Sequence, residues 1–262
     1  MRCVEMVFSP TGGTRRVADA IVAGLADEAV VVDLSDRSGD FAAVEVALED
    51  VVLVAMPCFG GRAPQVAMER LKQVRGKGGP AVVVNVYGNR AFDDALLEMA
   101  DGAAAAGFKV VAGVAAVAEH SIMLQYAKGR PDAADAELLA GIGREIRAAL
   151  DEGCTVNAGL VPGTRPFKQG GAVPLVPRVK GACTACGLCA AACPVGAIDS
   201  ATLKADKDRC IACMRCLKEC PVQARTVNPL LVKVAAAAIK KQAAEWKTPE
   251  LYVALRGDVL SE

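Results

Sequence analysis

Eight of the eleven cysteines form one pattern that is written twice. Each copy reads C-x2-C-x2-C-x3-C-P, and every cysteine of the second copy lies 27 residues after its counterpart. The first copy holds Cys183, Cys186, Cys189 and Cys193, and the second holds Cys210, Cys213, Cys216 and Cys220. A repeat of this kind predicts one small structural unit used twice, whose size and shape are set by what the thiols bind.

Residues 178–228 resemble the two-cluster bacterial ferredoxins, which carry this spacing. Val195-Gly196-Ala197 and Val222-Gln223-Ala224, which follow the two Cys-Pro pairs, extend the resemblance. In that family three closely spaced cysteines hold one 4Fe-4S cluster, and the cysteine before proline reaches the other cluster. The resemblance therefore implies two 4Fe-4S clusters, one on Cys183, Cys186, Cys189 and Cys220 and one on Cys210, Cys213, Cys216 and Cys193.

Structural zinc and disulfide bonds are the alternatives for these cysteines. Zinc sites favour pairs of C-x2–4-C, often with histidine, and four ligands for each ion. A third cysteine in register and a following proline, both repeated, do not fit that pattern and favour iron-sulfur clusters. Thiolates that hold iron also indicate a reducing compartment, so we expect a cytoplasmic protein.

The overall charge excludes the simplest argument for two kinds of partner. The chain has 30 basic and 30 acidic side chains and a formal net charge of zero. Nucleic-acid binding and attachment to an anionic membrane are therefore not expected. No run of about eighteen apolar residues is present, so no membrane-spanning helix is expected, and the N-terminus is typical of a strand and not of a signal peptide.

The first 150 residues alternate valine-rich apolar runs with helical stretches. Nearly continuous apolar runs are typical of strands buried on both faces of a parallel sheet. The predicted strands are Cys3–Phe8, Ala29–Leu34, Val51–Met56, Ala81–Tyr87 and Phe108–Val117, and the predicted helices are Thr14–Ala26, Gln65–Arg75, Asp93–Gly107 and Asp132–Glu152. The pattern predicts an α/β domain with a doubly wound five-stranded parallel sheet.

Changes in composition divide the chain into four parts. We assign residues 1–152 to the α/β domain and residues 153–177, which are rich in proline and glycine, to a linker. Residues 178–228 form a small α+β ferredoxin domain, and residues 229–262 form a helical extension with a helix near Leu230–Trp246.

The first predicted strand ends in the loop Phe8-Ser9-Pro10-Thr11-Gly12-Gly13-Thr14, and a helix follows. Free N–H groups at a helix N-terminus favour an anion, and hydroxyl groups add further donors. The loop lacks the lysine of a Walker A motif and the G-x-G-x-x-G of dinucleotide sites. It suits the single terminal phosphate of a mononucleotide, and an ordinary strand-to-helix turn is the alternative.

The same loop resembles the phosphate loop S/T-x-T-G-x-T of the flavodoxins, which bind flavin mononucleotide (FMN). The resemblance implies that two further loops, Met56–Pro64 and Tyr87–Asp94, enclose the isoalloxazine ring. The implied FMN residues are Ser9, Thr11, Gly12, Gly13, Thr14, Pro57, Phe59, Gly60, Gly61, Arg62, Tyr87, Gly88, Asn89, Arg90 and Phe92. Phe59 and Phe92 are the candidates for stacking, where flavodoxins often carry tyrosine or tryptophan, and Gly60 is the candidate for a peptide that rotates toward the flavin N5.

His120 is the only histidine of the chain and follows the fifth predicted strand. Its pKa range suits a proton donor to reduced flavin or to a substrate, and a hydrogen bond that holds the loop is the alternative. Arg62, Arg90 and Arg130 either stabilise an anionic flavin or pair with Asp93, Asp94 and Asp132. Cys3, Cys58 and Cys154 are expected to be ordinary thiols.

The order of the parts is a second resemblance. A flavodoxin-like domain followed by a two-cluster ferredoxin is similar to the prokaryotic flavodoxin–ferredoxin fusion proteins, over most of residues 3–228. It implies electron transfer between the clusters and FMN, as a converter between one-electron and two-electron carriers that works with a redox protein partner. An FMN-dependent reductase of a small molecule and a redox or oxygen sensor are the alternatives, so whether the chain is an enzyme stays open.

Overall fold

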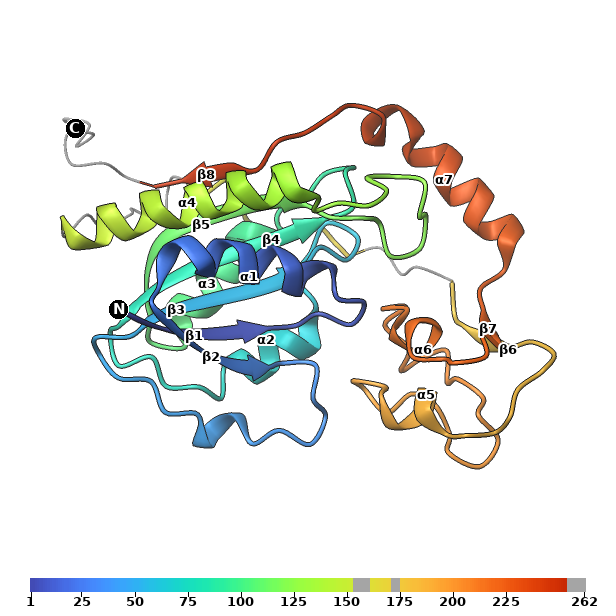
Figure 1. The fold of residues 1–262 in the computed structure, drawn as a ribbon. Helices are drawn as coiled ribbons and strands as arrows, with labels where there is room; N and C mark the ends of the chain where they lie inside the picture. The colour runs from blue at the N-terminus through green and yellow to red at the C-terminus, as the bar shows by residue number, and fades with distance from the viewer. Residues whose placement is uncertain (153–160, 171–174, 254–262) are drawn as a thin grey trace.

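The computed structural model describes residues 1–152, 161–170 and 175–253 (Figure 1). A twisted sheet flanked by helices forms the larger part. The cysteine-rich segment, residues 178–228, lies beside one end of it. Helix α7 (Pro229–Ala243) leads from the cysteine-rich segment back along the molecule to the sheet.

Five parallel strands form the body of the sheet. They are β1 (Arg2–Val7), β2 (Glu28–Asp33), β3 (Val51–Pro57), β4 (Pro80–Tyr87) and β5 (Lys109–Val117). Their order is β2-β1-β3-β4-β5, and all four pairings are parallel. This is the flavodoxin-like doubly wound order, so the predicted fold class is confirmed.

The valine-rich runs are buried because helices cover both faces of the sheet. Helices α1 (Gly13–Leu25) and α4 (Ala133–Asp151) pack on one face. Helices α2 (Gln65–Leu71) and α3 (Ala95–Ala105) pack on the other. Strand β2 departs from the expectation of burial, because it lies at the edge of the sheet and leaves Val30 50% and Val31 40% exposed.

A sixth strand, which the sequence analysis missed, closes the other edge. Strand β8 (Glu250–Tyr252) pairs antiparallel with β5. It lies within the predicted helical extension, after α7, whose first turn is capped by Asn228 and carries Pro229 at its start. The connection between β2 and β3 contains the short 3-10 helix η1 (Phe41–Ala43).

The cysteine-rich segment contains two copies of a short helix. Strands β6 (Arg178–Val179) and β7 (Arg225–Thr226) pair antiparallel, and helices α5 (Leu188–Ala191) and α6 (Arg215–Lys218) lie between them in the sequence. Each helix follows a residue in the left-handed conformation, Gly187 or Met214, in agreement with the repeat. Within the described ranges no helix has the length and apolar character that crossing a membrane requires.

Candidate functional site

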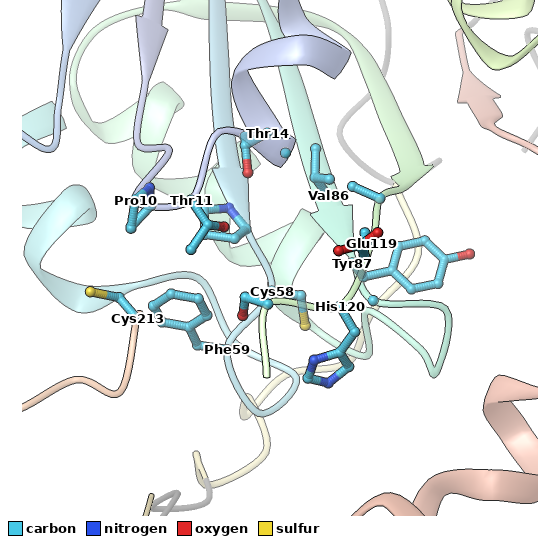
Figure 2. Close-up of a pocket in the computed structure, with 15 residues that line it drawn as sticks. Pro10, Thr11, Thr14, Cys58, Phe59, Val86, Tyr87, Glu119, His120 and Cys213 are labelled. Carbon is cyan, nitrogen blue, oxygen red and sulfur yellow. The ribbon is translucent and has the colours of Figure 1, made fainter. Parts of the chain in front are cut away.

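A cavity opens where the loops after β1, β3, β4 and β5 meet at the carboxyl edge of the sheet (Figure 2). It has about 480 Å³ of empty space, part of which is open to solvent. Eight residues predicted to bind or act on a flavin line it: Thr11, Gly13, Thr14, Pro57, Phe59, Tyr87, Gly88 and His120. The other predicted residues are not part of its wall: Ser9, Gly12, Gly60, Gly61, Arg62, Asn89, Arg90 and Phe92.

The loop before α1 offers hydrogen-bond donors to this cavity. The hydroxyl of Ser9 accepts a bond from the N–H of Arg15 at 2.9 Å, which closes the loop over the start of the helix. Gly12 has a φ of +90°, and nothing lies within 4 Å of the place of a Cβ. The N–H groups of Thr11, Gly12 and Gly13 have no hydrogen-bond partner among the residues that the structure describes. Unpaired donors in a turn that leads into a helix fit the terminal phosphate of FMN.

Aromatic side chains also line the cavity. Phe59 lines the cavity and meets Phe8 edge-on, with ring centroids 6.5 Å apart. Tyr87 also lines it, and burial raises the pKa of its hydroxyl to about 12, so the side chain is neutral. Phe92 packs against Tyr87 from behind, at a centroid distance of 5.4 Å, and is therefore a support for the loop. Only Phe59, of the two predicted stacking residues, faces the cavity.

Gly60 and Gly61 form the tip of a tight turn. Their φ values are +62° and +88°, and the backbones of Phe59 and Arg62 exchange hydrogen bonds across them at 2.9 and 3.2 Å. A Cβ on Gly61 would lie 2.3 Å from Oδ2 of Asp93, so a side chain there would collide. Gly60 is exposed, and its role in a peptide rotation stays a prediction.

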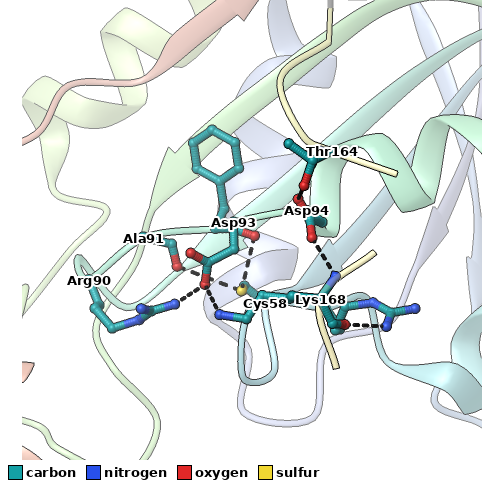
Figure 3. Close-up of polar contacts among 9 residues, drawn as sticks. Cys58, Arg90, Ala91, Asp93, Asp94, Thr164 and Lys168 are labelled. Carbon is teal, nitrogen blue, oxygen red and sulfur yellow. Dashed lines mark hydrogen bonds and ion pairs between the residues drawn. The ribbon is translucent and has the colours of Figure 1, made fainter. Parts of the chain in front are cut away.

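The three arginines of these loops are engaged in ion pairs. Arg62 binds Glu98 through two hydrogen bonds of 2.7 and 2.6 Å, and Arg130 binds Asp135 through two of 2.8 and 2.5 Å. Arg90 pairs with Asp93, as expected for that residue (Figure 3).

Asp94 and Asp132, the other predicted partners, are occupied by backbone groups. Asp94 accepts from the N–H groups of Thr164 and Lys168 at 2.9 and 2.7 Å (Figure 3). Asp132 caps helix α4. None of the three arginines therefore faces the cavity as a free cation.

His120 is fixed in its neutral form. Its Nδ1 accepts hydrogen bonds from the N–H groups of Ile122 and Met123 at 3.2 and 3.3 Å, so the proton of the neutral ring resides on Nε2. Burial lowers the pKa of the imidazole to about 4. The ring packs so closely on Gly88 that a Cβ there would come within 2.6 Å of it. This environment favours the loop-holding alternative over a charged proton donor.

The two described thiols outside the repeat, Cys3 and Cys58, are shielded. Cys58 lines the cavity, and its Sγ donates weakly to the carbonyls of Ala91 and Phe92 at 3.7 and 3.6 Å (Figure 3). Burial raises the pKa of Cys58 to about 11 and that of Cys3 to about 12, so both are protonated and unreactive at neutral pH. Cys154 lies outside the described residues.

The eight repeated cysteines surround two cavities. One, the outer cavity, is lined by Cys183, Cys186, Cys189 and Cys220. The other, the inner cavity, is lined by Cys193, Cys210, Cys213 and Cys216. In each case the cysteine before proline joins three cysteines of the other copy, which is the predicted grouping. That these thiols bind clusters stays a prediction.

Hydrogen-bond donors approach the sulfur atoms in both cavities. The N–H of Ala197 donates to Sγ of Cys193 at 3.2 Å, and that of Ala224 donates to Sγ of Cys220 at 3.1 Å. Such donors stabilise thiolates bound to iron. Residues 1–152, 161–170 and 175–253 contain no group of three or more His, Cys, Asp or Glu side chains placed to hold a single metal ion. Four thiols around a cavity fit a cluster of several irons, whose ligands are spread around its corners.

Cys213 lies in the wall of the inner cavity and also in the wall of the cavity at the carboxyl edge of the sheet, named the flavin cavity (Figure 2). The contact between the two parts is strengthened by Arg70, which is buried and donates to the carbonyls of Leu34 and Pro194, each at 2.6 Å. Pro194 follows the inner-cavity ligand candidate Cys193. The sequence analysis missed both Cys213 as a wall of the flavin cavity and Arg70, because neither contact leaves a local pattern.

The segment after α7 holds in place the loop Tyr87–Asp94, which follows β4. Nδ2 of Asn89 donates to the carbonyls of Ala243 and Glu245 at 2.7 and 2.8 Å. Nζ of Lys247 donates to the carbonyls of Asn89 and Arg90 at 2.5 and 3.0 Å. Asn89, predicted to bind the flavin, thus anchors the C-terminal segment.

Comparison with known proteins agrees with the cysteine pattern. Residues 182–224 match the family model of the 4Fe-4S dicluster domain. A search of curated proteins gives no match.

Solved structures resemble the first part of the chain. A flavodoxin from the domain Archaea is 16% identical, with a TM-score of 0.43, and the match covers 58% of this chain and 99% of that one. Oxidised flavodoxin 1 from Bacillus cereus is 18% identical, with a TM-score of 0.42, and covers 56% of this chain and 97% of its own. The flavodiiron core of Flv1 from Synechocystis sp. PCC6803 is 18% identical, with a TM-score of 0.41, and covers 58% of this chain and 36% of its own. Because these scores are low, the fold is assigned from the strand order itself.

Proposed function

We propose that the chain is an electron-transfer protein that joins two 4Fe-4S clusters, in the outer and inner cavities, to FMN at the carboxyl edge of the sheet. The observation that carries the proposal is the position of Cys213, which belongs to the wall of the inner cavity and of the flavin cavity alike. Two redox groups that share a wall are close enough to exchange electrons without a further carrier.

The residues present fit these groups. Each cysteine cavity supplies four thiols and an N–H donor to sulfur, and the flavin cavity supplies free N–H groups together with the side chains of Phe59 and Tyr87. Clusters carry one electron at a time and a flavin carries one or two, so together they would connect one-electron and two-electron chemistry.

The outer cavity is the place where we expect a redox protein partner to dock. Cys183 and Cys186 are exposed, whereas Cys213 and Cys216 of the inner cavity are buried. Val179, Leu188 and Val222 line the outer cavity and are 39%, 49% and 44% exposed. An apolar patch around the most accessible redox site is typical of a transient electron-transfer interface.

The experiment is a reductive titration of the protein purified without oxygen, followed by visible and EPR spectra. We expect about four electrons for each chain, one for each cluster and two for the flavin. Cys183→Ser and Cys210→Ser should each damage one cluster signal, and the two variants should differ in which signal is lost. An uptake of about two electrons without a flavin signal would overturn the FMN assignment, and an iron-free protein would overturn the clusters.

A second candidate is a reductase of a small molecule. A wide cleft with about 2580 Å³ of empty space, much of it open to solvent, runs beside the flavin cavity. Phe59 lies in the walls of both, and Cys210 also lines the cleft. Saturable reduction of a small quinone by the reduced protein would favour the reductase, whereas a rate that rises linearly with quinone concentration would favour the carrier.

A further inference from the structure

The two cysteine copies provide an internal comparison, because each residue of one has a counterpart 27 positions away in the other. The backbone donors obey this symmetry: Ala197 binds Cys193, and its counterpart Ala224 binds Cys220, at nearly equal distances. A difference between the outer and the inner cavity therefore comes from the side chains that differ between the copies and from their surroundings.

The clearest difference is at the residue after these alanines. In the first copy it is Ile198, which lines the inner cavity, and in the second it is Arg225, which lines the outer cavity. Both are buried, with exposed fractions of 7% and 5%. The repeat thus places an uncharged aliphatic side chain at one site and a permanent cation at the other.

Arg225 is bonded to neutral groups and to one cysteine. Its Nη2 donates to the carbonyl of Leu203 at 2.7 Å and to Sγ of Cys189 at 3.2 Å, and its Nη1 donates to the carbonyl of Pro177 at 3.4 Å. Its Nε is buried and has no partner. Within the described part of the chain, Arg225 forms no ion pair with Asp or Glu. A buried cation without a counter-charge is costly, so the geometry points to an anion in the outer cavity as its partner.

A second difference between the copies places a cation at the inner cavity, where its effect is weaker than that of Arg225 at the outer one. Arg215 borders the inner cavity, where its counterpart Leu188 borders the outer one. Arg215 is only partly buried and donates no hydrogen bond to a cysteine sulfur among the described residues. It also borders a polar cavity that contains Asp36. Nε of Arg215 is also buried without a partner. Its side chain is only partly buried and lies beside a carboxylate, however, so its charge is screened more than that of Arg225.

Solvent exposure, like Arg225, stabilises added negative charge at the outer cavity more than at the inner one. Cys183 and Cys186 of the outer cavity are exposed, whereas three of the four inner cysteines are buried. Hydrogen bonds to sulfur, local charge and exposure are the factors that set the potential of an iron-sulfur site, and added negative charge is stabilised by each of them.

We propose that Arg225 makes the two cysteine sites unequal, and that it gives the outer site, with Cys183, Cys186, Cys189 and Cys220, the higher reduction potential. This inference rests on the proposed function, because it requires a cluster in each cavity. It assigns Arg225 as a positioning and tuning residue of the outer site, with Ile198 as its uncharged counterpart at the inner site.

The test is an EPR-monitored redox titration of the anaerobically purified holoprotein, with the iron content measured in each sample. The wild type should show two cluster potentials, and Cys183→Ser should remove the higher one. Arg225→Gln should lower that potential more than the inner one, because the charge of Arg225 also reaches Cys210 and Cys216 of the inner cavity. At the outer site we expect about a tenfold change in the ratio of reduced to oxidised form at fixed potential, which corresponds to about 59 mV for one electron. Arg225→Lys, which keeps the charge, should shift it less.

Arg209→Gln is the matched control, since Arg209 is exposed in the same segment and donates only to the carbonyl of Val195. It should leave both potentials unchanged. Equal potentials in the wild type, or an unshifted higher potential in Arg225→Gln at full iron content, would overturn the inference and leave the proposed function intact. If Arg225→Gln loses iron, Arg225→Lys decides: a fall of the higher potential by about 59 mV or more at full iron content, although the positive charge is kept, would overturn the inference. An absence of cluster signals in the wild type would instead refute the proposed function.

Discussion

His120 shows how the immediate surroundings decide what a residue can do. Two backbone N–H groups bind its Nδ1, and burial lowers its pKa to about 4, so protonation would break these bonds. The neutral ring contributes stability that is complete above its unfolded pKa of about 6.5 and is lost as the pH falls through 4.

We therefore predict that His120→Gln leaves the pH dependence of the flavin midpoint potential unchanged between pH 6 and 8. No proton enters or leaves the ring in that range. Spectroelectrochemical titration at several pH values measures the slope for both proteins. A change of slope near pH 7 in the wild type that disappears in His120→Gln would show that the ring does relay protons.

The candidate site was predictable where chemistry follows from position on a strand. Thr11, Thr14, Phe59 and Tyr87 follow the carboxyl ends of parallel strands, which meet at one edge of the sheet. Arg62 and Asn89 were not predictable, because their partners, Glu98 and the carbonyl of Ala243, come from segments that no local pattern links to them. The cysteine grouping was predictable from the resemblance to the two-cluster ferredoxins, in which the cysteine before proline reaches the other cluster.

At the scale of elements, strand β1 carries an unusual buried charge. Glu5 is 1% exposed, and it pairs with Arg15 of α1 at 3.5 Å. Burial raises the pKa of Glu5 to about 7, above its unfolded value of 4.5. The stability associated with the protonated form is therefore complete below pH 4.5 and is lost as the pH rises through 7.

We expect Glu5→Gln to stabilise the protein at pH 8, by at most about 3 kcal/mol, and by less than about 1 kcal/mol at pH 5. The amide keeps the shape of the protonated carboxyl and cannot ionise. Denaturant unfolding at the two pH values measures the difference. Glu28→Gln, at the exposed start of β2, is the control and should change little at either pH. Equal effects of Glu5→Gln at pH 5 and pH 8 would contradict the assigned pKa.

The elements themselves were predictable to different degrees. Strands β1, β3, β4 and β5 begin and end within about two residues of the apolar runs, because burial on both faces requires continuous apolar sequence. The apolar run of β2 looks the same in the sequence, so the position of β2 at the exposed edge of the sheet could not be predicted from it. Strand β8 has only three residues, and its pairing with β5 is a long-range contact that local sequence does not encode.

At the scale of the whole molecule, Arg70 connects the sheet to the cysteine-rich segment. Its guanidinium lies 5.6 Å from the centre of the Phe41 ring and donates to one carbonyl on each side of the contact. Hydrogen bonds from a charged donor contribute about 1.5–3 kcal/mol each in buried settings. The contact with Pro194 thus fixes the segment that carries Cys193.

We predict that Arg70→Met loosens this contact and speeds amide hydrogen exchange of residues 195–197 by about tenfold, because one charged hydrogen bond is lost. Mass spectrometry of peptides from the holoprotein measures the exchange. Arg209→Met, which removes an arginine whose bond stays within the cysteine-rich segment, is the matched control for a local effect. Exchange that is no faster in Arg70→Met than in the wild type would show that the two parts are held by other contacts.

Strand β8 has a consequence for how this protein can be taken apart. Because the chain leaves the sheet after β5, passes through the cysteine-rich segment and returns to pair with β5, the cysteine-rich segment is an insertion tied down at both ends. A fragment cut after the second cysteine copy would therefore lose more than a tail. It would leave the backbone N–H and C=O groups along one side of β5 uncovered, and such a bare edge invites other chains to add on and aggregate.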